Sequence, residues 1–152
     1  MKNPTAIYTV LIIFSALGII NAGYLAITAL SGNVPTCNFI HGCDLVAKSP
    51  HSYFLGIPLS LYGVFFYSLV GGFSIWGLIN KQVNPRMLIV AVTGVGFLLS
   101  LYLLYLQAFV IYAYCEYCLF SLFDATVLFI VSFFLPKERH GILDETTNTK
   151  TL

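Results

Sequence analysis

Charged residues are scarce in this sequence. Asp, Glu, Lys and Arg together make up 9% of its 152 residues, whereas soluble domains contain roughly 25%. Hydrophobic residues make up 59%, and the mean hydropathy is +0.89. So little charge excludes an ordinary water-soluble domain, and the chain is predicted to lie in a lipid bilayer.

The sequence also lacks basic clusters and long polar stretches. Its formal net charge is only +1, so nucleic acid is not expected as a partner. The longest polar stretches are Ser31–Ile57 and Lys137–Leu152. Each is too short to bury a core of its own, which excludes a separate soluble domain.

Four long apolar runs predict four membrane-spanning helices, since about 20 helical residues cross the hydrocarbon core. The first run is longer than the apolar part of a signal peptide and has no clear small-residue cleavage site, so we expect it in the mature protein. Glycines within the runs are expected where helices pack closely. The predicted spans are about 8–30, 58–79, 87–113 and 118–135, and the glycines are Gly71, Gly72, Gly94 and Gly96.

Proline marks two predicted helix starts. Ser49-Pro50 and Asn84-Pro85 each combine an N-cap residue with proline at the first helical position, where its missing N–H is not needed. The first pair predicts a short helix before the second span, and the second pair predicts the start of the third span.

Positive charge predicts the orientation. Four spans bring both termini and the middle connection to one side, and cytoplasmic segments are enriched in Lys and Arg. Only Lys48 falls on the other side. Six of the seven Lys and Arg residues gather on the predicted cytoplasmic side, namely Lys2, Lys81, Arg86, Lys137, Arg139 and Lys150.

The expected fold class is therefore an all-α integral membrane protein of the cell (inner) membrane. Residues 1–136 form the predicted four-transmembrane-helix bundle, with a large extracytoplasmic loop between helices 1 and 2. Residues 137–152 form a polar cytoplasmic tail.

The sequence has only four cysteines, and all lie on the predicted extracytoplasmic face. Cys115 and Cys118 open the last span, where helix-terminal N–H groups and the helix dipole favour thiolate. Cys37 and Cys43 lie in the first loop. Cysteines facing an oxidising compartment can cycle between dithiol and disulfide. If Cys43 and Cys115 come within bonding reach, the two pairs form a relay.

Two structural alternatives remain for the cysteines. Static disulfides could staple the loop, which would fit a membrane scaffold without enzymatic activity. Four thiolates, with His41, could instead hold zinc, although the five-residue gap between Cys37 and Cys43 is wider than usual ligand spacing.

Several polar side chains lie near the cysteines or within the apolar runs. Asp124 is costly in a span and is predicted either to bond a neighbouring helix or to relay protons. Asn21 and Gln107 are expected to hydrogen-bond between helices. The negative charge of Glu116 disfavours a neighbouring thiolate, and so it counteracts the stabilisation of thiolate by the helix dipole. The remaining candidates are the loop histidines His41 and His51, as solvated residues or proton carriers, and Tyr112, Tyr114 and Tyr117, as an interfacial belt.

Four motifs follow one another along the chain: Cys37-x5-Cys43-Asp44, Ser49-Pro50, the run Leu55-Gly56-Ile57-Pro58-Leu59-Ser60-Leu61-Tyr62-Gly63, and Cys115-x-x-Cys118. Together they resemble the bacterial homologues of vitamin K epoxide reductase, the VKOR family. The resemblance extends from the first span to the last. A DsbB-like protein instead carries its Cys-x-x-Cys in the first outer loop.

The resemblance implies a membrane thiol-disulfide oxidoreductase with a quinone, ubiquinone or menaquinone, as electron acceptor. Cys37 would exchange with a reduced thioredoxin-like protein, Cys43 would pass electrons to Cys115, and Cys118 would lie nearest the quinone. The expected partner is a separate DsbA-like protein, because no fused thioredoxin-like domain is expected here. Ser49, Leu59 and Leu122 are the positions implied near the quinone.

Two positions depart from the vertebrate enzymes. Leu122 stands where they carry a tyrosine, and Leu59 where they carry an asparagine, both associated with the vitamin K head group. Support of disulfide bond formation is therefore the favoured function, and reduction of vitamin K epoxide or vitamin K quinone is the alternative.

Overall fold

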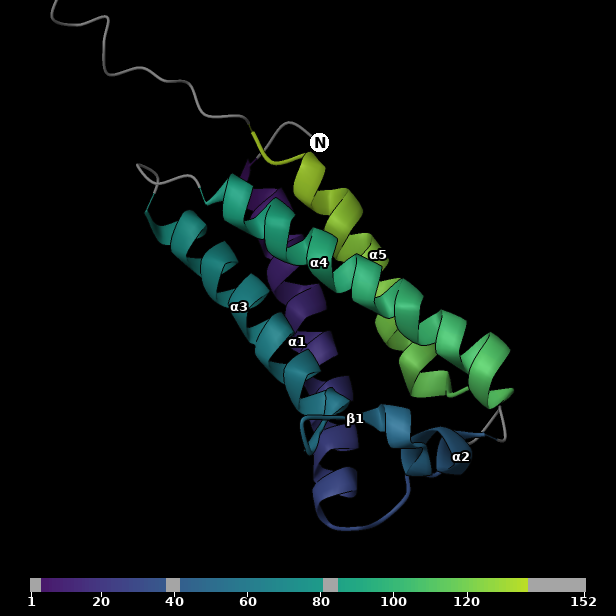
Figure 1. Ribbon diagram of the computed structural model, residues 1–152. Coiled ribbons are helices and arrows are strands. Elements are labelled where there is room, and N and C mark those ends of the chain that lie inside the picture. The colour runs from purple at the N-terminus through teal and green to yellow at the C-terminus, as the bar shows by residue number, and fades with distance from the viewer. Residues whose placement is uncertain (1–3, 38–41, 81–84, 137–152) are drawn as a thin grey trace, which may run out of the picture.

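The computed structural model describes residues 4–37, 42–80 and 85–136 (Figure 1). His41, Asn84 and the predicted tail lie outside these ranges. The described elements are α1 (Pro4–Leu30), α2 (Cys43–Lys48), η1 (Pro50–Ser52), β1 (Tyr53–Phe54), β2 (Ile57–Pro58), α3 (Leu59–Ile79), α4 (Arg86–Tyr105), η2 (Leu106–Ile111) and α5 (Glu116–Phe133).

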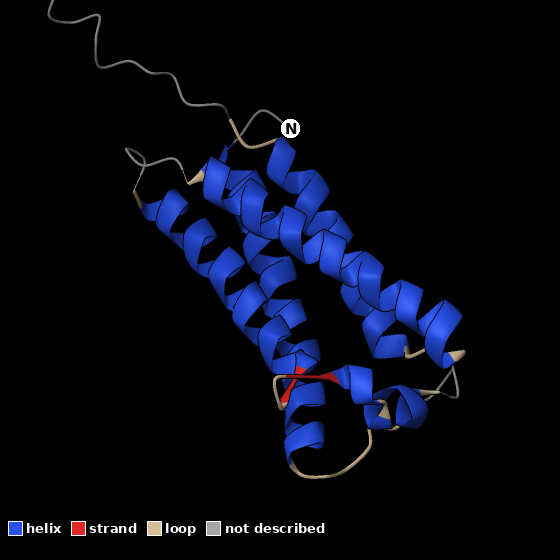
Figure 2. Cartoon of the chain, viewed as in Figure 1, coloured by secondary structure: helices blue, strands red, loops and turns tan. Residues whose placement is uncertain are grey.

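The described part of the chain is mostly helical (Figure 2). Four helical segments are long and apolar enough to cross a membrane: α1, α3, α4 continued by η2, and α5. This confirms the predicted number of spanning helices. The last of them ends at Phe133, two residues before the predicted end, because Pro136 disfavours helical geometry in the residue before it.

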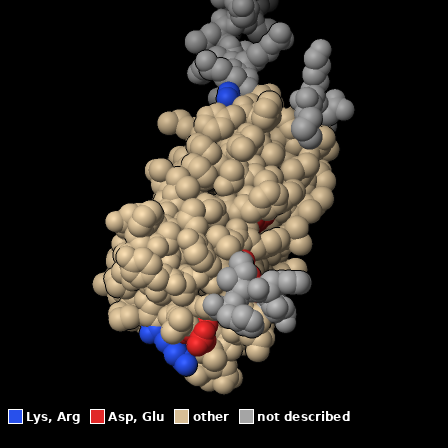
Figure 3. Space-filling view, turned by 90° about the vertical axis from the view of Figure 1, so that its right-hand side faces the viewer, with Lys and Arg blue, Asp and Glu red and all other residues tan. Residues whose placement is uncertain are grey.

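The helices pack around a narrow apolar core and leave a wide apolar outer surface. Leu11, Val70, Ile89 and Leu128 are completely buried, one from each helix. Many large apolar side chains elsewhere on the same helices are exposed. Figure 3 shows a face on which Lys and Arg appear only near its two ends. Such a surface suits contact with lipid tails rather than water.

Close helix packing explains three of the four predicted glycines. At Gly96 an added Cβ would overlap the Phe66 ring, and at Gly71 and Gly94 it would meet a neighbouring helix at 3.4 Å and 3.3 Å. The prediction for Gly72 is wrong. This residue lies on the outer face of α3, where an added Cβ would meet nothing within 4 Å.

The segment between α1 and α3 contains α2, the 3-10 turn η1 and a β-hairpin. The predicted cap at Ser49 is confirmed, because its side chain accepts a hydrogen bond from the His51 N–H at 3.2 Å. β1 and β2 pair antiparallel, with Phe54 opposite Ile57. The two residues between the strands, Leu55 and Gly56, both have positive φ, as the tightest hairpin turns require.

The bundle has two different ends. The start of α1, the end of α3, the start of α4 and the end of α5 lie at one end (Figure 1). α2 lies at the opposite end, beside the turn that joins α4 to α5. The two cysteine pairs, separated by some seventy residues of sequence, therefore belong to the same end of the molecule.

Candidate functional site

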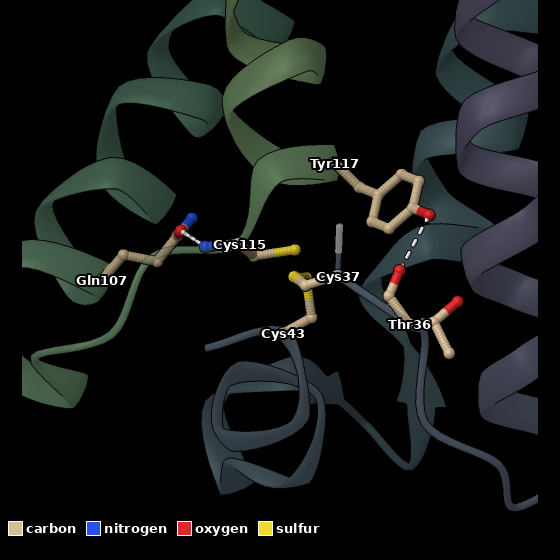
Figure 4. The surroundings of a disulfide bond; sticks show 6 residues. All are labelled: Thr36, Cys37, Cys43, Gln107, Cys115 and Tyr117. Carbon is tan, nitrogen blue, oxygen red and sulfur yellow. Dashed lines mark hydrogen bonds between the residues drawn. A yellow bond between two sulfur atoms is a disulfide. The ribbon is translucent and has the colours of Figure 1, made fainter. Parts of the chain in front are cut away.

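All four cysteines meet where α2 packs against the start of α5. Cys37 and Cys43 form a disulfide with a Cα–Cα distance of 5.9 Å, while Cys115 and Cys118 are free thiols. The Cys115 sulfur points toward the disulfide (Figure 4). Cys43 and Cys115 share one buried cluster, and Cys37 and Cys118 pack against it. The structure therefore brings together the two predicted pairs.

Gly42 permits this approach. An added Cβ at Gly42 would lie 2.7 Å from the carbonyl oxygen of Tyr114 and 3.3 Å from the Ala113 Cβ. The backbone just before Cys43 therefore rests directly on the backbone just before Cys115. Sequence reasoning missed Gly42, because the need for glycine comes from a contact with a segment far along the chain.

The turn between α4 and α5 is shaped around Gln107. α4 ends in a π-helical segment, η2, followed by Tyr112 in the left-handed region; π-helical turns occur often at functional sites. The buried Gln107 side chain accepts a hydrogen bond from the Cys115 N–H through Oε1 at 2.8 Å (Figure 4). This bond fixes the backbone of Cys115 and confirms the predicted role of Gln107 between helices.

Two bonds hold α1 and the following segment against α5. Asn21 Nδ2 donates to the Tyr117 carbonyl at 3.1 Å, which confirms the predicted interhelical bond of Asn21. The Tyr117 hydroxyl donates to the Thr36 carbonyl at 3.1 Å (Figure 4). Thr36 directly precedes Cys37, so Tyr117 holds the disulfide segment in place. The other two residues of the predicted interfacial belt, Tyr112 and Tyr114, are exposed.

The surroundings of Cys115 favour its thiolate form. Its sulfur accepts a hydrogen bond from the Cys118 thiol, and the N–H groups of Cys118 and Tyr117 at the start of α5 add to this effect. Burial and the charge of Glu116 act in the opposite direction. The net result lowers the pKa of Cys115 to about 7, so a large fraction of this thiol is ionised at neutral pH.

Two cavities adjoin at Cys118. One, of about 340 Å³, lies under α2 and includes Cys43, Cys115 and His51 in its wall. The other, which we call the bundle cavity, has a volume of about 530 Å³ and lies between the helices, open at the outer surface where the exposed Phe65, Val95 and Leu99 line it. Its lining is mostly apolar and aromatic. Residues common to both linings are Leu25, Leu59, Ser60, Leu103 and Cys118. Cys118 can therefore contact a ligand in the apolar cavity while its partner thiol faces the disulfide.

The three residues that the family resemblance implies near the quinone differ in whether they line a cavity. Leu59 lines both cavities. Ser49 caps η1, with its Oγ 3.4 Å from His51 Nδ1, and lines neither cavity. Leu122 also lines neither. Two residues with hydroxyl groups, Tyr67 and Ser121, line the bundle cavity instead. They could not be singled out from the sequence, because many residues with hydroxyl groups occur within the apolar runs.

No metal site is visible in the part of the chain that the structure describes. Within residues 4–37, 42–80 and 85–136, no group of three or more His, Cys, Asp or Glu side chains could hold an ion.

The fold and the site define a four-helix membrane protein with two adjoining cysteine pairs at one end. The family model described as vitamin K epoxide reductase family matches residues 9–133, which is most of the chain. The protein belongs to this family, and it is therefore a membrane oxidoreductase of a kind generally linked to quinones and thioredoxin-like partners. No curated protein matches the sequence.

The hydrogen bond from Cys118 predicts how Cys115 responds to pH. Thiolate reacts with alkylating reagents and thiol does not, so alkylation of Cys115 should rise with pH around a midpoint near 7. Cys118→Ala removes the donor and should move the midpoint upward, toward the ordinary value of about 8.5. Cys118→Ser keeps a donor and should stay near the wild type. Mass spectrometry of the peptide containing Cys115 measures the midpoint; equal midpoints in all three proteins would contradict the assignment.

Gly42→Ala should loosen the contact between α2 and the α4–α5 turn, because the new methyl group meets the backbone of Tyr114. Cys115, only 2% exposed, should then be alkylated several-fold faster at a pH where it is fully ionised. Gly23→Ala is the matched control, since an added Cβ there meets nothing within 4 Å. Equal alkylation rates in Gly42→Ala and Gly23→Ala would show that Gly42 does not hold α2 over the thiol.

Proposed function

We propose that this protein passes electrons from a reduced thioredoxin-like protein to a membrane quinone and so sustains disulfide bond formation. The proposed donor is a separate DsbA-like protein, and the acceptor is ubiquinone or menaquinone. The observation that carries the proposal is the meeting of the Cys37–Cys43 disulfide with the free thiols of Cys115 and Cys118. Family membership supports the donor and acceptor classes.

The exposure of the outer pair supports its proposed order. Cys37 is partly exposed, whereas Cys43 is only 1% exposed. A soluble partner can therefore attack or release Cys37 more readily than Cys43. We assign exchange with the partner to Cys37 and exchange with the inner pair to Cys43, which shares the buried cluster with Cys115.

Transfer between the pairs proceeds by thiol–disulfide exchange. The partner reduces the Cys37–Cys43 disulfide and is itself oxidised. Cys43 thiolate then attacks an oxidised Cys115–Cys118 pair at Cys115, which forms a Cys43–Cys115 bond and releases Cys118. Cys37 attacks Cys43 and releases Cys115 as thiolate. The outer pair is then a disulfide and the inner pair a dithiol, the same redox state as in the structure.

The reduced inner pair then reacts with quinone. Two electrons leave the inner pair as the Cys115–Cys118 disulfide forms, and the quinone takes up these electrons and two protons to become quinol. The bundle cavity suits the quinone because its wall is apolar and aromatic and includes Cys118 and Leu59. Apolar clefts with few polar groups are the usual sites for such ligands.

The proposed location is the cell (inner) membrane, with both termini cytoplasmic and the cysteines on the extracytoplasmic face. The distribution of Lys and Arg along the sequence supports this orientation. It places the outer pair in the oxidising compartment in which exported proteins acquire disulfides.

Loss of quinone absorbance tests the proposal. Purified protein in detergent is mixed with dithiothreitol and either ubiquinone or menaquinone, beside the Cys118→Ala variant. We expect the wild type to consume quinone and Cys118→Ala to consume none above the background rate, because the inner disulfide cannot form. Cys118→Ala retains the Cys37–Cys43 disulfide, so unchanged thermal unfolding serves as its control for folding.

A wild type that consumes neither quinone would overturn the proposal. The cysteines would then have a structural role, as in a membrane scaffold. Consumption by Cys118→Ala at the wild-type rate would also overturn it, because electrons would reach quinone without the inner pair.

A further inference from the structure

Asp124 is a buried acid that the electron route does not use. It lies in α5 and is 1% exposed. Neither carboxyl oxygen has a hydrogen-bond partner among the described residues. A carboxylate buried in this way inside a bilayer would lack hydrogen-bond donors from the described residues to stabilise it. The group is therefore expected to carry a proton, which makes it a proton donor rather than a fixed negative charge.

Two hydroxyl groups, those of Tyr67 and Ser121, lie in the bundle cavity wall near Asp124. The Tyr67 side chain neighbours the Asp124 carboxyl, although no hydrogen bond joins the two, and its hydroxyl lies 2.9 Å from Ser121 Oγ. Tyr67 and Ser121 both line the bundle cavity, as does Cys118. Cys118, Ser121 and Asp124 follow at intervals of three along α5, so that Ser121 neighbours both of the others on the helix surface.

The position of Tyr67 is tightly fixed. Its side chain is 1% exposed, and an added Cβ at Gly18 of α1 would overlap its ring. The Tyr67 hydroxyl also donates to the Ser121 carbonyl at 3.2 Å. Among the described residues, Tyr67 of α3 is the titratable side chain beside the Asp124 carboxyl.

Quinone reduction needs a proton donor in this position. In the molecules in which Cys115 is a thiolate, its proton has already gone to solvent. The reduced pair then delivers two electrons and the single Cys118 proton to quinone, as the Cys115–Cys118 bond forms. The product is the singly protonated quinol anion, whose second oxygen still needs a proton. Six residues of helix place Asp124 roughly 9 Å beyond Cys118 along the axis of α5, farther from the cysteine end of the bundle.

We propose that Asp124 supplies this second proton through the Tyr67 and Ser121 hydroxyls. The inference rests on the proposed reduction of quinone. Asp124 gives one proton to the quinol anion, becomes a carboxylate, and regains a proton from solvent after the quinol leaves. The proton that Cys115 lost to solvent balances the one that Asp124 takes up. The sum is two thiols plus quinone giving one disulfide plus quinol.

Asp124→Asn tests the relay with a side chain of similar shape that cannot donate an acid proton. Quinone reduction should slow by roughly a hundredfold, the lower end of what general acid catalysis contributes. The wild-type rate should rise with pH as Cys115 ionises and fall at higher pH as the donor loses its proton. Asp124→Asn should lack the fall at high pH, and Asp124→Glu should restore part of the rate together with that fall.

The controls separate this inference from the proposed function. A wild type that consumes no quinone would remove the proposed function itself. A wild type that does, beside an Asp124→Asn variant with the same rate and pH profile, would overturn only the relay. Alkylation of Cys115 with an unchanged midpoint in Asp124→Asn should show that the thiol site is intact.

Tyr67→Phe provides an independent test if Asp124→Asn does not fold. It keeps the ring that packs on Gly18 and removes only the hydroxyl link. The proposed relay predicts a slower rate and the loss of the fall at high pH in this variant as well. An unchanged rate and pH profile in a folded Tyr67→Phe protein would overturn the relay.

Discussion

The site depends on the direct contact between two stretches of backbone, at Gly42 and at Tyr114. This contact brings the start of α2 onto the turn between α4 and α5, and so places Cys43 beside Cys115. No side chain larger than a hydrogen atom fits at the point of closest approach. The other features of this end of the molecule serve the same purpose: Gln107 fixes the backbone of Cys115, and Tyr117 fixes the residue before Cys37.

The arrangement solves a problem of two solvents. A protein reductant stays in water, whereas a quinone stays in lipid. The outer pair, Cys37 and Cys43, lies at the start of α2 at the end of the bundle. Cys118 lies in the wall of an apolar cavity between the helices. Cys115 faces the outer pair and hydrogen-bonds with Cys118. In the proposed route the inner pair joins the two environments, with thiol exchange on the side of the outer pair and quinone reduction on the side of the cavity.

Much of this could be predicted from the sequence, because a bilayer imposes simple rules. Apolar runs of sufficient length must form helices, and their number fixes which ends of the chain meet. The cysteine spacing and the Ser49 cap are likewise local signals. The role of Gly42 could not be predicted, since it depends on contact with Tyr114 some seventy residues later. Ser49 and Leu122 were expected near the quinone but line neither cavity. The direction in which a side chain points depends on packing, which its position in the sequence does not fix.

Aspartate within a span was a clear sequence signal, but its neighbours were not. Asp124 invites a functional interpretation wherever it lies in a membrane helix. Only the packing of α3 on α5 reveals that Tyr67 and Ser121 meet each other in the cavity wall near Asp124. Gly18 allows the Tyr67 ring to reach that position, and glycines in apolar runs give no sign of which ring they accommodate.

Trapping the bond between the two pairs tests the central claim most directly. In the Cys37→Ala, Cys118→Ala double variant, neither remaining cysteine has its own partner. Oxidation should then join Cys43 to Cys115 within one chain, and peptide mapping without reductant would identify the bond. The matched Cys43→Ala, Cys118→Ala variant should form the Cys37–Cys115 bond much more slowly. Free thiols in the first variant, or preferential bonding of Cys37 to Cys115, would contradict the proposed route.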